Sequence, residues 1–343
     1  FLSQLSLQPL SWPEQLLIKP TSKIFSGTDP HGMRLRLNLL LAKLYGDDEK
    51  SVYFITSRAS KPRLPARFTR SKTDGRSLPM CRWIAYTGPE IFLEDLLFDQ
   101  EYSIASQSLD ARESVFRTNA DGFGVAWYAK RSTPGLFKDI LPAWNDSNLR
   151  SIAAQIEAGL FFAHVRASTG TSVTRTNCHP FTFKNWAFMH NGKIGNWTTC
   201  RKSVEQMISP AFYSARQGTT DSEAMFLLAL SLGLEQDPPG ALMAMLARVR
   251  EVMDEQAATE PLRVSLAVTD GSSIWALRCS SDDQSPSLYY GCPVTRASKQ
   301  SDQALCTIAS EPLDSDASHW LKVEEGVGIH WSKQQITEFR ARI

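Results

Sequence analysis

A cysteine stands directly after a methionine in the segment "SLPMCRWIAY", residues 77–86. If removal of Met80 leaves Cys81 as the first residue, that residue carries both a thiol and a free α-amine. The pKa of an α-amine is about 8, against about 10.4 for lysine, so the amine can accept the thiol proton near neutral pH and later pass it to a leaving amine. Cys81 could then serve as nucleophile and base together. A small buried thiol in a strand is the ordinary role of a free cysteine, and the dipeptide alone favours that role.

Thiolate attack on an amide creates an oxyanion, which needs preorganised hydrogen-bond donors. The segment "FMHNGKIGN" (188–196) ends an apolar run at Asn191 and Gly192, which offer a side-chain amide and an unhindered backbone N–H. An Asn-Gly pair is also a common turn, and a turn is the simpler interpretation of this segment on its own.

Two charged residues could bind a substrate. Arg166 follows the apolar run 160–165, and its guanidinium could clamp a carboxylate while Thr169 adds a hydroxyl donor. Asp221, beside the start of an apolar helix, could accept an ammonium group. A surface ion pair and a helix cap are the ordinary alternatives for the two charges. The segment "NADGFGVAWY" (119–128) allows close backbone approach, either as a structural turn or as a loop that lines a site.

Hydrophobic periodicity and turn signals predict the elements that must position these residues. Strand patterns occupy 81–88, 123–130, 160–168 and, around an Asp-Gly turn, 264–279, with shorter strand-like runs at 287–291 and 304–310. Helical patterns occupy 146–159, 219–233 and 238–256; the second opens with a capping box and is apolar nearly all round, which indicates burial between layers. This order of strands, helices and strands predicts an α+β protein or layered sandwich rather than a regular βαβ repeat.

Composition indicates an ordinary globular protein, since 42% of the 343 residues are apolar and 21% are charged. No apolar run approaches the roughly 18 to 20 residues that span a bilayer, so no membrane segment is expected. The six cysteines form no CxxC pair, and adjacent residues such as Cys178 and His179 seldom chelate one metal. We therefore expect reduced thiols, a cytoplasmic location and no metal.

Charge divides the chain at the Met-Cys pair. Residues 1–79 hold 13 Lys/Arg against 6 Asp/Glu, whereas residues 80–343 hold 24 against 30. The stretch 58–76 is rich in Pro, Ser and Arg without apolar period, which is typical of a solvated linker, and no aromatic platform supports nucleic-acid binding. We expect 1–79 to be a basic, disordered extension and 80–343 to be the folded domain.

Eight segments in this order resemble the class II glutamine amidotransferases, which are hydrolases with an N-terminal cysteine nucleophile. More narrowly, they look like the stand-alone amidotransferase-like subunits of the fungal alternative glutathione-degradation complex and their bacterial relatives. The segments are "MCR", "DGFGVAWY", "PAWN", "AHVRAST", "TNCHPF", "FMHNG", "TDSE" and "ASEPL". The resemblance implies a four-layer αββα sandwich with two antiparallel sheets. It also implies that Cys81 is the nucleophile, its α-amine the base, and Asn191 with Gly192 the oxyanion hole.

The same resemblance implies the substrate contacts. It places Arg166 and Thr169 at the α-carboxylate of a glutamine-like substrate and Asp221 at its α-ammonium. His179 is a weaker candidate for the pocket wall, and a satisfied structural histidine is the alternative. No organic cofactor or metal is implied.

The predicted activity is hydrolysis of a γ-glutamyl amide through a γ-glutamyl thioester, with γ-glutamyl peptides or conjugates such as glutathione preferred to glutamine. A glutaminase subunit that feeds ammonia to a separate synthase is the alternative enzyme, since no second long domain is legible that could use ammonia. A peptidase partner is expected from the resemblance alone.

The segment before Met80 departs from the family pattern, because an upstream peptide bond turns the α-amine into an amide. Three explanations are open: an over-extended gene model, a cleaved propeptide, or an inactive binding or scaffold subunit. The absence of an initiator at Phe1, the linker-like composition and the change of charge favour the first.

Overall fold

The computed structural model describes residues 81–109, 120–167, 171–293, 306–332 and 335–343. The predicted extension 1–79, Met80 and Thr169 lie outside these ranges. All structural statements below concern the described residues.

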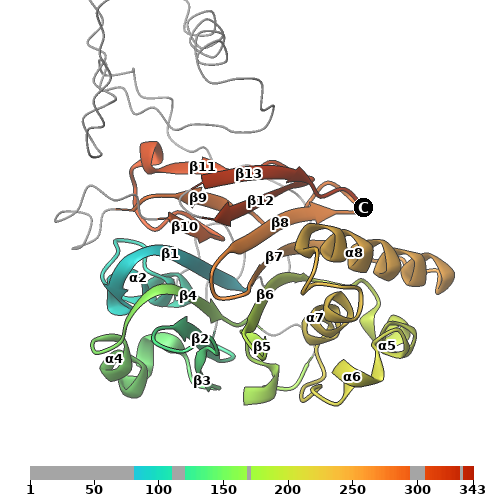
Figure 1. Ribbon diagram of the computed structural model, residues 1–343, viewed down its shortest axis with the longest axis horizontal. Helices are drawn as coiled ribbons and strands as arrows, with labels where there is room; N and C mark the ends of the chain where they lie inside the picture. Colours follow the sequence, from blue (N-terminus) through green and yellow to red (C-terminus); the bar gives the residue numbers. More distant parts are fainter. Residues whose placement is uncertain (1–80, 110–119, 168–170, 294–305, 333–334) are drawn as a thin grey trace, which may run out of the picture. The chain divides into compact units, whose positions relative to one another are not determined.

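Two antiparallel sheets form the centre of the described chain (Figure 1). The first has seven strands in the order β11-β9-β10-β1-β4-β2-β3, and the second has six in the order β13-β12-β8-β7-β6-β5. The strands of the first sheet are β1 (Arg82–Phe92), β2 (Phe123–Tyr128), β3 (Gly135–Asp139), β4 (Glu157–Val165), β9 (Tyr289–Gly291), β10 (Cys306–Ala309) and β11 (Trp320–Lys322). Those of the second are β5 (Phe181–Phe183), β6 (Trp186–Lys193), β7 (Arg263–Thr269), β8 (Ile274–Ser280), β12 (Val327–Ser332) and β13 (Gln335–Arg340).

Helices cover the outer face of each sheet. Three short ones belong to the first sheet: α2 (Glu94–Leu97), α3 (Ile104–Leu109) and α4 (Ser147–Ala153). Four belong to the second: α5 (Trp197–Gln206), α6 (Pro210–Tyr213), α7 (Asp221–Ser231) and α8 (Pro238–Glu255). The 3-10 turns are η2 (Ala143–Asn145), η3 (Arg175–Asn177) and η5 (Ala317–His319).

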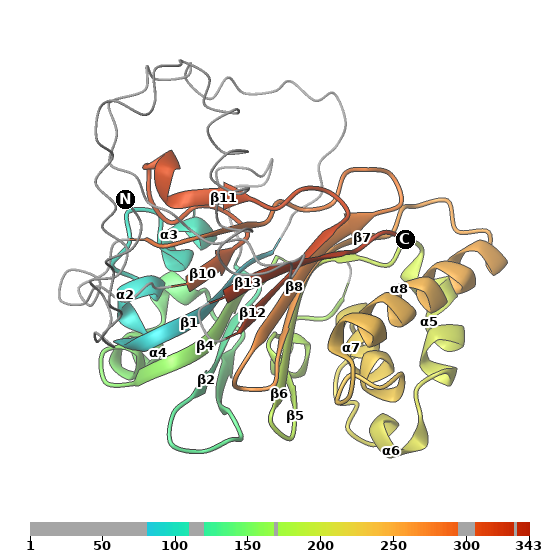
Figure 2. The ribbon, with the colours of Figure 1, turned by 45° about the horizontal axis from the view of Figure 1, so that its top comes forward.

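The buried side chains separate into the three interfaces of a four-layer sandwich. In β1, Ile84 and Tyr86 pack toward the α2–α4 layer, whereas Trp83 and Ala85 pack into the space between the sheets. This follows from the period of two along a strand. A third cluster joins α5, α7 and α8 to β6, β7 and β8, and Figure 2 shows these helices gathered beside one sheet. The predicted α+β class and αββα sandwich are confirmed.

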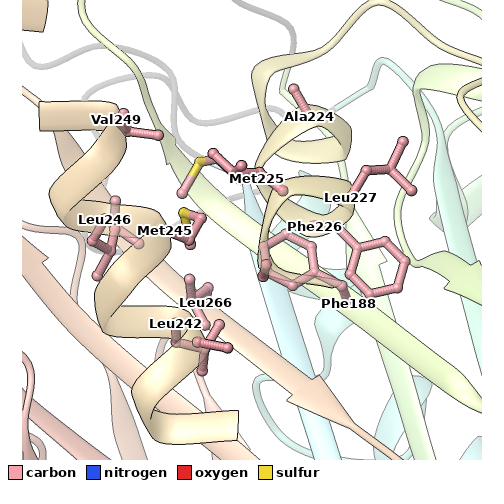
Figure 3. Packing of buried hydrophobic residues seen from close by; sticks show 14 of the residues in the cluster. Phe188, Ala224, Met225, Phe226, Leu227, Leu242, Met245, Leu246, Val249 and Leu266 are labelled. Atoms are coloured by element: carbon pink, nitrogen blue, oxygen red, sulfur yellow. The ribbon is translucent and has the colours of Figure 1, made fainter. Parts of the chain in front are cut away.

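The helix α7 has the burial that its sequence predicts, with an apolar side chain buried in every turn. Phe226 stacks on Phe188 of β6 with ring centroids 5.3 Å apart, and Figure 3 shows the two rings next to each other. On the other side α8 packs Met245 and Val249 against the same layer. The Thr220 hydroxyl accepts a hydrogen bond from the Glu223 N–H and so caps the helix, as the capping box predicts.

One predicted helix is too long. The pattern over 146–159 predicts helix throughout, but α4 ends at Ala153 and β4 begins at Glu157. Residues 157 and 158 pair with Phe92 and Ile91 of β1, so the ladder of the sheet overrides their helix propensity. The predicted strands, the hairpin of β7 and β8, and the helices α7 and α8 are confirmed within two to four residues at their ends. Within the described chain, no helix combines the length and apolar character that crossing a bilayer requires.

Candidate active site

Cys81 lies just before β1, where the chain enters the first sheet. Arg82 pairs with Val165 across β1 and β4, so Cys81 comes beside the residues that follow β4. The Ala167 N–H donates to the Cys81 Sγ at 3.3 Å, and the Sγ lies 3.5 Å from the Ala167 carbonyl oxygen. The thiol is therefore held at the end of β4 by backbone groups.

Asn191 approaches the same end from the second sheet. In β6, Ala187 and Met189 point into the space between the sheets, and the strand period gives Asn191 the same face. Its side chain is buried. The His164 Nε2 of β4 donates to the His190 carbonyl oxygen at 3.3 Å, which ties the two sheets together there. Cys81 precedes β1 at the point where β4 ends, and Asn191 follows His190 in β6, so the thiol and the Asn191 amide lie at one end of the sandwich.

Gly192 occupies a position that only glycine tolerates. Its φ is 144°, in the region that side-chain-bearing residues rarely adopt. A Cβ at this position would collide with the Arg263 carbonyl oxygen of β7 and lie 2.7 Å from the His190 Nε2. Gly192 is still paired with Val264 of β7, and the close approach of that strand leaves no room for a side chain at this position.

The Arg166 side chain is buried and held by two neighbouring segments. Its Nη2 donates to the Thr171 Oγ1 at 2.6 Å, and its Nη1 donates to the Asp121 carbonyl oxygen at 3.4 Å. Backbone hydrogen bonds with Asp121 and Gly122 complete the junction. The Asp-Gly-Phe-Gly loop therefore lines the arginine site rather than forming a remote turn, and a surface ion pair is not the role of Arg166. Thr171 was not predicted, although it lies in the polar loop that follows Arg166.

Asp221 joins the start of α7 to the loop that follows β6. Its Oδ2 accepts from the Ile194 N–H at 2.9 Å, and its Oδ1 accepts from the Ser222 N–H at 2.8 Å. Thr220 already caps the helix, so the carboxylate of Asp221 has a different task. The Ser222 Oγ shares a 2.9 Å hydrogen bond with the His190 Nδ1. These contacts fix Asp221 next to the Asn-Gly segment.

His179 is buried in the wall between the sheets. Its ring stacks on His164 at 4.1 Å between centroids and meets the Phe181 ring edge-on at 4.6 Å. Neither ring nitrogen has a hydrogen-bond partner within the part of the chain that the structure describes. Burial lowers the pKa of His179 well below its ordinary value, so the ring is neutral. It is not the satisfied structural histidine that was the alternative.

Electrostatics around Cys81 keep its thiol protonated. Burial is the largest effect and raises the pKa of the Cys81 thiol. The Ala167 hydrogen bond and the positive charges of Arg166 and Arg82 lower it, while the negative charge of Asp221 raises it. Among the described residues the hydrogen-bond partners of the Sγ are backbone groups of Ala167. A nucleophile in this setting needs a base to remove its proton.

Within the described ranges, no group of three or more His, Cys, Asp or Glu side chains could hold a metal ion. The described cysteine thiols are unpaired with one another: Cys81, Cys178, Cys200, Cys279 and Cys292.

The profile of the family "Glutamine amidotransferases class-II" matches residues 96–290, more than half of the chain. This chain therefore belongs to the class II glutamine amidotransferases and is an enzyme of that type. Cys81 and the whole of β1 precede the matched range.

Two relatives carry names that describe chemistry. The probable glutamine amidotransferase DUG3 of Saccharomyces cerevisiae is 35% identical over 298 residues, which is 75% of this chain and 83% of that protein. The gamma-glutamyl-hercynylcysteine sulfoxide hydrolase of Mycolicibacterium smegmatis is 28% identical over 199 residues, or 57% of this chain and 78% of that protein.

Solved structures agree with the sandwich. A glutamine aminotransferase class-II domain protein from Silicibacter pomeroyi superposes with a TM-score of 0.60 at 36% identity, covering 77% of this chain and all of that one. Glutamine phosphoribosylpyrophosphate amidotransferase from B. subtilis superposes with a TM-score of 0.54 at 16% identity, over 76% of this chain and 49% of that one, which shows the fold alone.

Proposed function

We propose that the protein hydrolyses the γ-glutamyl amide bond of a small substrate, with Cys81 as the nucleophile. One observation supports the proposal: the Cys81 thiol, the buried Arg166 and the buried Asn191 lie on neighbouring segments, at the end of the sandwich where the His164 to His190 hydrogen bond joins the sheets. Asp221 is close enough to act on the charge of the same thiol.

The α-amine of Cys81 is proposed as the base. It takes the thiol proton, and the thiolate attacks the γ-carbonyl carbon. The Asn191 amide and the Gly192 N–H donate to the oxyanion that forms. When the tetrahedral intermediate collapses, the α-ammonium gives its proton to the departing amine, and a γ-glutamyl thioester remains on Cys81. Water, deprotonated by the same amine, then attacks the thioester and releases glutamate with the free thiol.

Recognition of the γ-glutamyl group is proposed for three charged or polar side chains. Arg166 pairs with the α-carboxylate because a guanidinium presents two parallel donors to two oxygens, and Thr169 adds a hydroxyl. Asp221 accepts from the α-ammonium. His179 forms part of the neutral wall beneath them, since its stacking partner His164 lies two residues before Arg166.

This mechanism imposes a condition on the chain. Only an enzyme whose first residue is Cys81 has the free amine, so we propose that residues 80–343 constitute the catalytic domain and that 1–79 are absent from its active form. We also propose a γ-glutamyl peptide or conjugate, such as glutathione, as the substrate, because a relative of 28% identity is named as a hydrolase of a γ-glutamyl conjugate. A peptidase or synthase subunit remains the proposed class of protein partner.

The test uses protein expressed from Met80, with an N-terminal Cys81 verified by intact mass. Glutamate release is measured from glutathione and from glutamine. We expect faster release from glutathione and loss of release from both in Cys81→Ala, while Cys200→Ala, which alters a buried thiol in α5, remains active. Faster hydrolysis of glutamine would overturn the substrate assignment. Full activity in Cys81→Ala would overturn the mechanism.

A further inference from the structure

Arg82, the residue after the proposed nucleophile, forms a buried ion pair. Arg82 is 1% exposed and Glu311 is 2% exposed. The Arg82 Nε donates to the Glu311 Oε1 at 2.6 Å, and the Nη2 contacts the same oxygen. Replacing a buried ion pair by apolar residues of similar size is often neutral or stabilising, because the charges must lose their water. Stability alone is therefore a weak reason for this pair.

The guanidinium also contacts the nucleophilic residue directly. The Arg82 Nη1 donates to the Cys81 carbonyl oxygen at 2.9 Å. The described pairing of β1 with β10 ends at Ile84 and Ala309. Beyond it, Ser310 exchanges two hydrogen bonds with the Trp83 backbone, at 3.0 and 3.1 Å. The Arg82–Glu311 pair continues these contacts between the start of β1 and the end of β10, and through Arg82 they reach the Cys81 carbonyl.

A chain terminus needs such an attachment. The first residue of a chain is joined by one peptide bond, and termini fray unless they are tied down. A nucleophile displaced by about 1 Å can lose about 10²-fold in rate. The Ala167 backbone holds the Cys81 thiol, but a restraint on the main chain is also needed to aim the thiol and the α-amine together.

We propose that Arg82 and Glu311 are positioning residues that hold the main chain of Cys81 in the reactive geometry. The inference rests on the proposed function, since it requires Cys81 to be the nucleophile. Glu311 orients the guanidinium, and the guanidinium fixes the Cys81 carbonyl. The pair acts mainly by geometry: the positive charge of Arg82 lowers the pKa of the Cys81 thiol, but burial, the Ala167 hydrogen bond and Arg166 each affect that pKa more.

Two single variants test geometry against charge. Arg82→Lys keeps the positive charge but lacks the planar fork that reaches Cys81 and Glu311 together. Glu311→Gln leaves the arginine without its carboxylate. In enzyme with a verified N-terminal Cys81, we expect both to lower kcat at least about tenfold while KM changes less than about threefold.

A matched control comes from another buried arginine. Arg278 of β8 pairs with Glu325 at 3.2 Å and with Ser285, and it is 8% exposed. We expect Glu325→Gln to lower the melting temperature while kcat stays within about twofold of the parent. If Arg82→Lys and Glu311→Gln behave like this control, the pair is merely structural and the proposal is overturned.

If a single variant fails to fold, the double variant Arg82→Met/Glu311→Met tests whether the pair positions Cys81. Apolar replacement removes both charges and is compatible with stability. We expect a folded protein with kcat lowered by about 10²-fold; kcat within about twofold of the parent would refute positioning. Cys81→Ala in the same assay separates the two claims, because activity without the thiol would overturn the proposed function itself.

Discussion

At the scale of single residues, the candidate site combines a protonated thiol with groups suited to an oxyanion and to two opposite charges. Burial raises the pKa of the Cys81 thiol despite the nearby Arg166. The surrounding protein therefore does not keep the Cys81 thiol ionised before substrate binds. The chemistry depends on proton transfer at the moment of attack, which makes the α-amine indispensable to the proposed mechanism.

A single added residue tests that dependence. A chain that begins with glycine immediately before Cys81 keeps the thiol but converts the α-amine into an amide. We expect normal folding by circular dichroism and a loss of hydrolysis comparable to that in Cys81→Ala. Activity close to that of the unblocked enzyme would show that another group is the base.

The oxyanion donor is open to a similar test. Asn191→Ala removes one donor, and we expect kcat to fall about 10²–10³-fold with little change in KM, because the interaction forms in the transition state. Asn185→Ala is the control, since Asn185 precedes β6 and donates to the Asp270 carbonyl oxygen at the opposite end of the strand. An equal loss in both variants would contradict the assignment.

Buried histidines make a prediction about acid stability. Burial lowers the pKa of His164 to about 3 and that of His179 well below 6.5. In the unfolded chain both rings bind protons near pH 6.5. The unfolded state therefore binds more protons below that pH. The contribution of these two neutral rings to the free energy of unfolding is fully present above pH 6.5 and is lost as pH falls toward 3.

Replacing one ring with an apolar one checks this sign. His179→Phe preserves a ring for stacking on His164 and removes a titrating group. We expect the melting temperature of the parent to fall more steeply between pH 6.5 and 4 than that of His179→Phe. Parallel falls would show that His179 does not carry the acid sensitivity.

At the scale of elements, α7 links the core to the site. Its apolar length packs between β6 and α8, while its first turn carries Asp221 and Ser222 to the end of β6. Packing of the helix therefore determines where the carboxylate stands relative to the Asn-Gly segment.

The core contact of this helix can be measured. Phe226→Ala removes the ring that stacks on Phe188, and we expect the free energy of unfolding to fall by about 3–5 kcal/mol in denaturant titration. Leu232→Ala at the end of the same helix is the control. Because Leu232 is 37% exposed, we expect this substitution to change the free energy of unfolding by no more than about 0.5 kcal/mol. Similar losses would contradict the packing described here.

At the scale of the whole molecule, the proposed boundary at residue 80 separates a basic segment from an acidic domain. We expect the 343-residue chain and the protein expressed from Met80 to melt within about 2 °C of each other, and only the shorter one to hydrolyse substrate. A lower melting temperature after removal of 1–79 would mean that those residues contribute to the core. Calorimetry and the glutamate assay on the same preparations check both parts.

Local patterns were sufficient for much of this protein. The strand-like segment 81–88, the mostly apolar run 160–168, the apolar length of 219–233 and the turn at Asp270 and Gly271 each predict an element that the structure contains. Motif resemblance predicted the class and the residues to inspect. The short edge strands and the helices α2 and α3 have few residues each, so their local signals are weak.

Contacts between distant segments could not be read from such patterns. Arg82 and Glu311 are 229 residues apart, yet the pairing of β1 with β10 brings them together. Helix propensity at 157–159 lost to the ladder with β1 for the same reason: pairing energy depends on the partner strand.

The sequence by itself determined the order of the longer central strands, the helices α7 and α8, and the chemistry available at Cys81, because periodicity and reactive groups are local properties. Only the tertiary structure decided that the thiol rests on Ala167, that Asp121 and Thr171 hold Arg166, and that Asp221 bonds to Ile194. These contacts arise from strand register and from the packing of two sheets face to face. Both are set by the whole set of buried side chains at once, and no single segment of the chain encodes them.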